Sequence, residues 1–153
     1  PAIEIKLHTG DPDLALTRVQ NNEEDISIAA KPDTLPKDLA FKPIGISPLL
    51  FIAPKQKSTL IDNLLPATTI DHWAHTPMIL SEGGVSRDRV DEWFRKKGTK
   101  PNIYAQVAGN EAIVSMVSLG FGVGVVPKIV LDNSPLAEKI EILTVQPELQ
   151  PYE

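Results

Sequence analysis

NEAIVSMVSLGFGVGVVP, residues 110–127, predicts a helix, a glycine-rich turn and a strand. Asn110 suits the N-cap of a helix, and apolar residues recur at helical spacing until Gly120 ends that helix. The apolar run at 123–126 is rich in β-branched residues, which is typical of a strand covered on both faces, and Pro127 ends it. This stretch therefore predicts a sheet with helices on both sides.

The three glycines of this stretch, Gly120, Gly122 and Gly124, resemble a dinucleotide-binding fingerprint only superficially. Such a fingerprint follows a strand and opens a helix, whereas these glycines follow a helix and open a strand. We therefore expect no dinucleotide cofactor. The interpretation that remains is structural, because glycines allow a helix and a strand to pack closely.

The composition indicates an ordinary globular protein of 153 residues, with 42% hydrophobic and 23% charged residues, arranged as one domain or as two small lobes. The absence of cysteine removes disulfides, thiol nucleophiles and thiolate metal sites. The net charge of -5 is opposite to the basic surface that holds nucleic acid, so we expect no direct contact with DNA. No apolar run approaches the roughly 20 residues that cross a bilayer, and the first residues do not read as a secretory signal.

The beginning of the chain predicts a strand, a helix and a second strand. Residues 2–7 alternate apolar and polar side chains, which indicates a strand with one buried face. Asp11 is placed as the N-cap of a helix that runs to about Gln20, and residues 26–29 form the next strand. The two strands should lie parallel in one sheet, joined by a right-handed crossover.

The rest of the chain predicts a second series of the same kind. Residues 41–53 form two extended stretches that cross between lobes, and 54–76 form a long connection with weak helical signal. The second series comprises a strand at 77–80, a helix from a Ser86 cap to Gly98, a strand at 102–107, the stretch 110–127, a helix start at 127–131 and a strand at 140–145. Together they predict a two-lobed α/β protein with a cleft.

Three places meet the rule that ligands of open parallel sheets bind beyond the carboxyl ends of strands, namely residues 9–11, 81–86 and 108–111. Around Ser86, hydroxyls and free backbone N–H groups could hold a carboxylate without a metal. The alternative is a capped helix start, which needs only Ser86. Asp88 and Glu111 stand near these donors and would oppose an anion.

No catalytic or metal-binding set emerges from the sequence. His72 and His75 have a spacing that can ligate a metal on a helix, but no carboxylate or third histidine lies nearby in sequence, which favours a solvated or packing role. No G-x-S-x-G elbow occurs. We therefore predict that the chain is not an enzyme.

Three segments resemble the effector-binding domain of LysR-type bacterial transcriptional regulators, and together they cover most of the chain. They are PxIEIKLxTGDxxxAxxxVxxxEEDISIAAKP at the beginning, PMILSEGGVSRDRVDEWFRKKG at 77–98 and NEAIVSMVSLGFGVGVVP at 110–127.

The resemblance implies two Rossmann-like lobes joined by two crossing strands, as in type II periplasmic binding proteins, with an inducer between the lobes. Residues 1–46 would be part of lobe I, 47–146 would be lobe II and 147–153 would begin the return crossover. Lobe I would be incomplete here, since the family's first strand and helix should precede Pro1 and its returning strand and helix should follow Glu153.

The resemblance also implies which residues contact the effector. They come from the turn after the first strand, the end of the next strand, the loop and helix start at 81–86, and the cleft-side start of the helix at 110. Ala30 departs from the small hydroxyl residue that the family places at several of these positions. The implied residues are Thr9, Gly10, Ala30, Lys31, Ser81, Glu82, Gly83, Gly84, Ser86, Asn110 and Glu111.

The stretch 103–135 is most similar to family members that activate acetohydroxy acid isomeroreductase, which implies a small 2-aceto-2-hydroxy acid as inducer, acetolactate or acetohydroxybutyrate. The resemblance further implies a cytoplasmic homodimer or homotetramer that needs no cofactor and no membrane, and that binds DNA only through an N-terminal winged helix-turn-helix. A periplasmic solute-binding protein for a small carboxylate shares this fold and is the alternative. An enzyme of the same architecture comes third.

Overall fold

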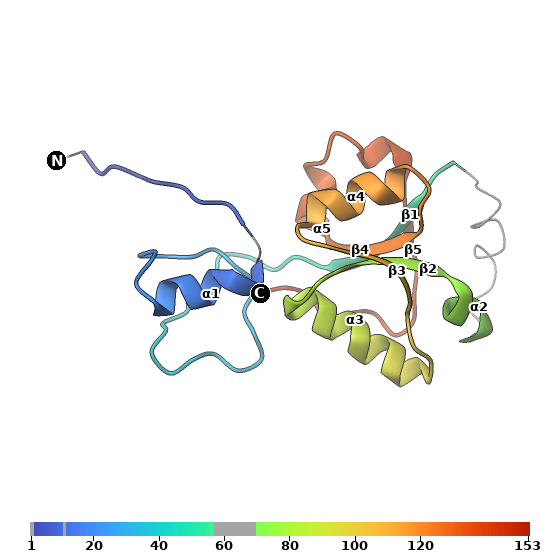
Figure 1. The fold of residues 1–153 in the computed structure, drawn as a ribbon, viewed down its shortest axis with the longest axis horizontal. Coiled ribbons are helices and arrows are strands. Elements are labelled where there is room, and N and C mark those ends of the chain that lie inside the picture. Colours follow the sequence, from blue (N-terminus) through green and yellow to red (C-terminus); the bar gives the residue numbers. More distant parts are fainter. Residues whose placement is uncertain (1, 11, 57–69) are drawn as a thin grey trace.

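The computed structural model describes residues 2–10, 12–56 and 70–153. Helix α1 (Pro12–Gln20) and the irregular segments around it form one part, and a five-stranded sheet with its helices forms the other, as Figure 1 shows. The predicted N-cap Asp11 and residues 57–69 of the predicted connection lie outside the described residues.

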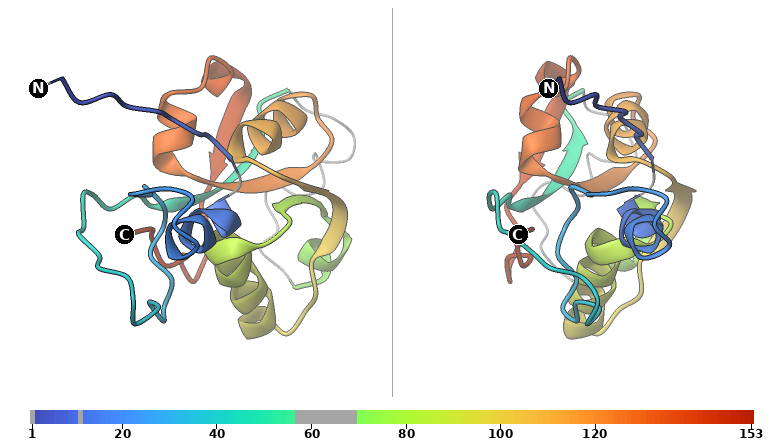
Figure 2. Two further views of the ribbon diagram at one scale, coloured as in Figure 1. Left: turned by 60° about the vertical axis from the view of Figure 1, so that its left-hand side comes forward. Right: turned by 90° about the vertical axis from the view of Figure 1, so that its left-hand side faces the viewer.

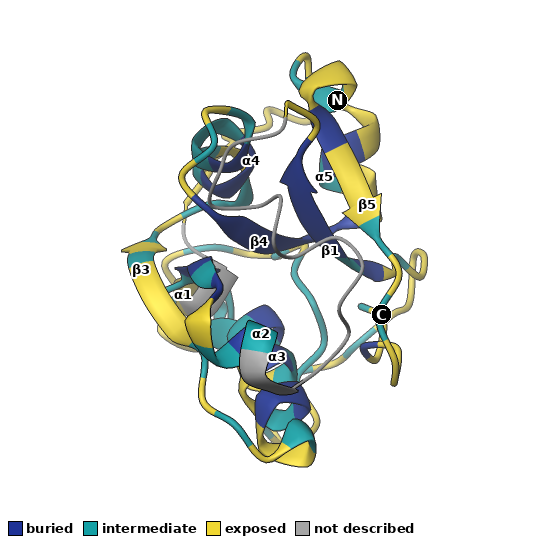
Figure 3. Cartoon of the chain, turned by 90° about the vertical axis from the view of Figure 1, so that its right-hand side faces the viewer, coloured by how far each residue is buried: buried dark blue, intermediate teal, exposed yellow. Residues whose placement is uncertain are grey.

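The sheet is mixed, with the strand order β3-β2-β4-β1-β5. Strand β2 pairs parallel with both β3 and β4, whereas β1 pairs antiparallel with β4 and β5. The central strands are buried and the two edge strands are largely exposed, which Figure 3 shows by colour. The strands are β1 (Leu49–Pro54), β2 (Pro77–Ser81), β3 (Asn102–Val107), β4 (Val123–Pro127) and β5 (Ile140–Leu143).

Helices cover both faces of the sheet, which confirms the sheet predicted from residues 110–127. Helix α3 (Gly84–Lys97) lies on one face, and α4 (Asn110–Ser118) with α5 (Lys128–Asp132) lies on the other (Figure 1). Gly98 ends α3 in the left-handed conformation, as the sequence predicted. The remaining helical pieces are α2 (Ile70–His75) and the 3-10 turn η1 (Ala137–Lys139).

The strands bury alternate side chains in two separate cores. Phe51 and Ala53 of β1 face the core under α3, whereas Ile52 faces the core under α4. Strand β2 divides in the same way, with Met78 facing the α3 side and Ile79 facing the α4 side. A strand with two buried faces needs apolar residues at every position, and this is why its sequence lacks a polar alternation.

Two glycines of the stretch 110–127 allow close packing against neighbouring elements, as predicted. A Cβ atom at Gly124 would lie 2.5 Å from a methyl carbon of Ile113 and 3.0 Å from one of Val117, both on α4. A Cβ atom at Gly122 would lie 2.4 Å from the carbonyl oxygen of Pro77 on β2. The dinucleotide interpretation has no support, because these residues join a helix to a strand.

The predicted strands at 2–7 and 26–29 are wrong for the described residues. Both segments are irregular, and their apolar side chains are exposed, with Ile3 at 87% and Ile28 at 86%. The first segment runs away from the rest of the molecule in Figures 1 and 2. An alternating pattern forms a strand only beside a partner, and the described part of the chain brings none to these two segments. The completion of lobe I by other residues stays a prediction.

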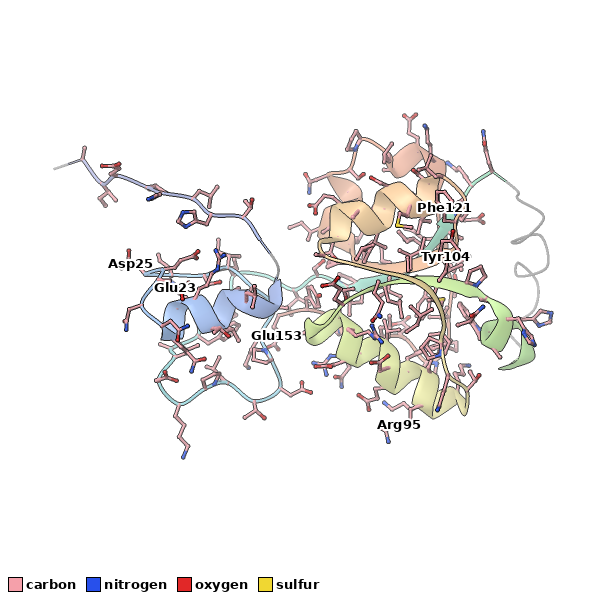
Figure 4. All side chains as sticks on the ribbon, in the orientation of Figure 1. Glu23, Asp25, Arg95, Tyr104, Phe121 and Glu153 are labelled. Atoms are coloured by element: carbon pink, nitrogen blue, oxygen red, sulfur yellow. The ribbon has the colours of Figure 1, made fainter. Side chains whose placement is uncertain are left out.

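The two parts of the molecule are joined by the chain on either side of Ser47 and by the last residues. Ser47 and Tyr152 form an isolated antiparallel bridge, in which each backbone N–H donates to the other's carbonyl at 2.9 and 2.8 Å. Lys31 is linked to Glu153 by a backbone hydrogen bond of 3.1 Å and by an ion pair of 3.4 Å. Glu153 lies between α1 and α3 in Figure 4. The lobe boundaries at 46 and 146 stay a prediction.

Candidate functional site

A cleft of about 160 Å³ lies where the two parts of the molecule meet. Strands β2 and β3 run parallel, with Ser81 opposite Val107, so their carboxyl ends share one edge of the sheet. The chain leaves β2 into α3 on one face and leaves β3 into α4 on the other. This reversal is the kind of place where open α/β sheets bind ligands. The cleft is lined by Leu16, Ala30, Ser81, Gly83, Gly84, Val85, Ser86, Asp88, Gly109, Asn110 and Tyr152.

The helix starts at the cleft differ from the prediction in which residues cap them. Gly83 is the N-cap of α3 and Gly109 is the N-cap of α4, so the predicted caps Ser86 and Asn110 are wrong. Ser86 is the third residue of α3 and Asn110 is the first residue of α4. Local sequence favoured Ser and Asn as caps, but the positive φ of 88° at Gly109 suits only glycine, and this moves the start of α4 by one residue.

Neither helix start receives a hydrogen bond from the side chain of its N-cap residue. The first N–H groups of a helix have no partner within the helix and carry a partial positive charge. Two such helix ends therefore reach one cleft, and a carboxylate is a suitable partner for them.

Ser86 adds a second polar feature. Its side chain is buried, with 4% of the residue exposed, and it lines the cleft. Within the described ranges its hydroxyl has no hydrogen-bond partner. Because Ser86 belongs to the cleft lining, its hydroxyl can donate a hydrogen bond to a ligand or a water molecule there.

Arg87 holds the loop that carries Ser81. Its Nη1 donates to the Ser81 carbonyl at 3.0 Å and to Gln106 Oε1 at 2.6 Å, and its Nε donates to Asp91 Oδ1 at 3.0 Å. A guanidinium group offers several donors in one plane, so a single side chain joins α3 to the ends of β2 and β3. The loop entering α3 is therefore held at Ser81 by this side chain.

Arg89 joins the two parts of the molecule beside the cleft. Its two Nη atoms donate to the carboxylate of Asp33 at 2.8 and 3.1 Å, and Arg89 is mostly buried while Asp33 is exposed. The hydrogen bond from Arg89 and its positive charge lower the pKa of Asp33. The same hydrogen bond raises the pKa of Arg89.

Asp33→Asn is expected to weaken this contact with a definite pH dependence. A carboxylate with a lowered pKa stabilises the fold above its ordinary pKa of 3.8, and that contribution is lost as the pH falls through the lower pKa of the folded state. The variant should have a slightly lower thermal midpoint at pH 6, since exposed ion pairs contribute little. The difference from the parent should shrink as the pH falls through that lower pKa of Asp33. Asp91→Asn, which breaks a pair within α3, is the control; a constant difference at all pH values would contradict the assignment.

The structure places the predicted effector residues in two groups. Six of them line the cleft together: Ala30, Ser81, Gly83, Gly84, Ser86 and Asn110. Five lie elsewhere. Thr9 and Gly10 are in the exposed segment before α1, Lys31 turns to Glu153, Glu82 is exposed, and Glu111 lines a separate hollow between α4 and α5. Their contact with an effector stays a prediction.

Sequence reasoning did not name several lining residues. Asp88 was noticed only as a charge that would oppose an anion. Val85 and Gly109 are next to predicted effector residues in the sequence, so their position could have indicated that they line the cleft. Leu16 and Tyr152 had none, because α1 and the last residues reach the cleft only through the tertiary fold.

Two further expectations concern metals and membranes. Among the described residues, no three His, Asp or Glu side chains gather in a way that could hold a metal ion. His72 and His75 are therefore not part of such a group in the described ranges. In the described ranges no helix is long and apolar enough to span a bilayer. Helix α3, for example, has 14 residues.

Comparison with known proteins finds a family and close relatives. The model of the LysR substrate binding domain matches residues 1–153. The HTH-type transcriptional activator IlvY of Haemophilus influenzae is 42% identical over 100% of this chain, and the HTH-type transcriptional regulator IlvY of Escherichia coli K12 is 40% identical over the same share. The chain spans about half the length of these relatives, 52% in both cases.

A solved structure supports the fold. The effector binding domain of QuiR in complex with shikimate matches with a TM-score of 0.69 and 20% identity. The match covers 90% of this chain and 64% of the QuiR chain. At this level of identity the match concerns the fold alone.

Proposed function

We propose, because this chain belongs to the LysR substrate-binding domain family, that it senses the inducer of a transcriptional regulator and binds a small 2-aceto-2-hydroxy acid in the cleft between α1 and α3. The observation that carries the proposal is the meeting of two helix N-termini, without side-chain caps, around the unpartnered hydroxyl of Ser86. These donors suit a carboxylate.

The size and lining of the cleft support a small ligand. An apolar cavity of about 150 Å³ in another protein holds benzene, so about 160 Å³ suits an acid of similar size. Acetolactate and acetohydroxybutyrate carry one carboxylate, one hydroxyl and one ketone on a short carbon chain. Leu16 and Val85 offer apolar contacts for the alkyl groups, and Ser81, Ser86 and Asn110 offer polar ones.

The relatives support a regulatory role over the two alternatives. Both IlvY proteins are named HTH-type regulators of transcription, which does not favour a periplasmic solute-binding protein or an enzyme. In the full-length protein, inducer binding would change how a DNA-binding region binds its operator. This change would activate expression of acetohydroxy acid isomeroreductase, which is also called ketol-acid reductoisomerase. DNA contact would come from a winged helix-turn-helix outside this chain, in a cytoplasmic homodimer or homotetramer.

Ser86→Ala is expected to lower inducer affinity by about one to two orders of magnitude. The hydroxyl would donate a hydrogen bond to a charged carboxylate, which is worth about 1.5 to 3 kcal/mol. Because Ser86 is not the N-cap, α3 should keep its stability without it. Calorimetric titration of the full-length protein with acetolactate and acetohydroxybutyrate measures the effect.

The matched control is Ser118→Ala, which removes a hydroxyl bonded to the Ser115 carbonyl at the end of α4. Its affinity should equal that of the parent. If Ser86→Ala bound as tightly as the parent while Thr9→Val weakened binding strongly, the carboxylate would lie on the first lobe. If the parent itself bound neither acid, the proposed inducer class would be wrong.

A further inference from the structure

Asp88 is the only charged residue among those that line the cleft in the described part of the chain. The other lining groups are apolar side chains, glycine backbone, hydroxyls and one amide. A cleft that holds a carboxylate by helix N-termini contains a negative charge of its own. That combination restricts which acids can bind.

The Asp88 carboxylate is available to a ligand. Arg87 directs its guanidinium to Asp91, Ser81 and Gln106, and Arg89 directs its guanidinium to Asp33. Within the described ranges Asp88 itself has neither a hydrogen bond nor an ion pair. Asp88 is exposed and lines the same cleft as Ser86, so a ligand held by Ser86 would share the cleft with the Asp88 carboxylate.

We propose that Asp88 selects among acids by accepting a hydrogen bond from the ligand hydroxyl and by repelling a second carboxylate. The inference rests on the proposed function and specifies it, because it makes the cleft a site for monoanionic hydroxy acids. An ionised carboxylate only accepts hydrogen bonds, so it favours a hydroxyl and disfavours another carboxylate at the same place. In a cleft of about 160 Å³ a second negative charge could not move far from Asp88.

The helix N-termini alone would not select monoanionic acids over dianionic ones. Helix N-termini attract every anion, and a dianion more than a monoanion. Asp88 provides the opposing element, since specificity often depends on a group that disfavours the wrong ligand. Without Asp88 the cleft should accept dicarboxylates that the parent rejects.

The test compares two probes of nearly equal shape in the full-length protein. Acetolactate carries an acetyl group on its central carbon, and 2-hydroxy-2-methylpropanedioate carries a second carboxylate in that position. Calorimetric titration of the parent should show a strong preference for acetolactate. Asp88→Asn should reduce this preference at least about tenfold, chiefly through tighter binding of the dicarboxylate.

Two variants serve as controls. Asp88→Glu keeps the charge and should keep most of the preference. Glu92→Gln makes the same charge change one turn away on α3, outside the cleft lining and paired with Arg95 and Lys96, and should leave the preference within about twofold of the parent. Thermal midpoints show that the variants are folded.

The outcomes separate this inference from the proposed function. A parent that binds acetolactate, with an unchanged preference in Asp88→Asn, would overturn the role of Asp88 and leave the proposed function standing. An equal shift in Asp88→Asn and Glu92→Gln would also overturn it, because the effect would then come from net charge. A parent that binds neither probe would overturn both.

Discussion

Trp93→Ala is expected to lower the free energy of unfolding by about 3 to 5 kcal/mol, the range for truncating a large buried aromatic side chain. Trp93 is buried on α3, and its ring centroid lies 4.8 to 5.1 Å from those of Phe51, Trp73 and Phe94. Truncation would leave a void among three aromatic rings, because close-packed neighbours relax only partly. Chemical denaturation of the parent and the variant measures the difference.

Trp93→Phe separates packing from hydrogen bonding. The indole Nε1 donates to the carbonyl oxygen of Pro147 at 2.8 Å, and Phe keeps a ring without this donor. We expect Phe to retain more than half of the stability that Ala loses. Equal losses in both variants would show that the hydrogen bond, and not the packing, is the dominant contribution of Trp93.

Gly122→Ala is expected to destabilise the protein by about 1 to 3 kcal/mol, towards the upper end of the range for overpacking. The new Cβ would meet the backbone oxygen of Pro77, the first residue of β2, at 2.4 Å. A backbone atom within a sheet cannot rotate away as a side chain can. Strand β2 would therefore have to shift relative to the segment that enters β4. Chemical denaturation of the parent and the variant measures this cost.

Gly45→Ala is the matched control for this prediction. A Cβ at Gly45 has nothing within 4 Å, and the residue does not require a positive φ. The substitution should be neutral or slightly stabilising, because alanine restricts the unfolded chain. If Gly122→Ala were as harmless as Gly45→Ala, the close approach of these segments would not be necessary for the fold.

Sequence patterns predicted an element correctly where the pattern lies within one short stretch of the sequence. The stretch 110–127 contains its helix, its turn and a strand whose every residue is buried, and the structure has all three in the predicted order, with Gly109 and not Asn110 as the N-cap. The predicted strands at 77–80 and 102–107 and the helix ending at Gly98 were also confirmed. For the central strands β2 and β4, burial on both sides leaves a continuous apolar run, which can be recognised without knowing the partners.

The same reasoning failed at residues 2–7 and 26–29. Alternation shows that one side of a segment could be buried, but it does not say what would cover it. In the described residues these segments have no pairing strand, so their isoleucines are exposed. A strand is a property of two segments, whereas a helix such as α1 satisfies its hydrogen bonds within itself.

The sequence by itself determined the layered α/β sheet of residues 77–127, the loop 81–86 as a ligand candidate and the family resemblance. Only the tertiary structure decided which residues share the cleft. It brought Leu16 and Tyr152 to α3, turned Lys31 towards Glu153 and placed Asp88 as the charged residue of the described cleft lining. The physical reason is range. Caps, turns and burial patterns depend on residues that are close together in the sequence. A cleft between distant segments depends on strand order and on long-range pairs such as Ser47 with Tyr152.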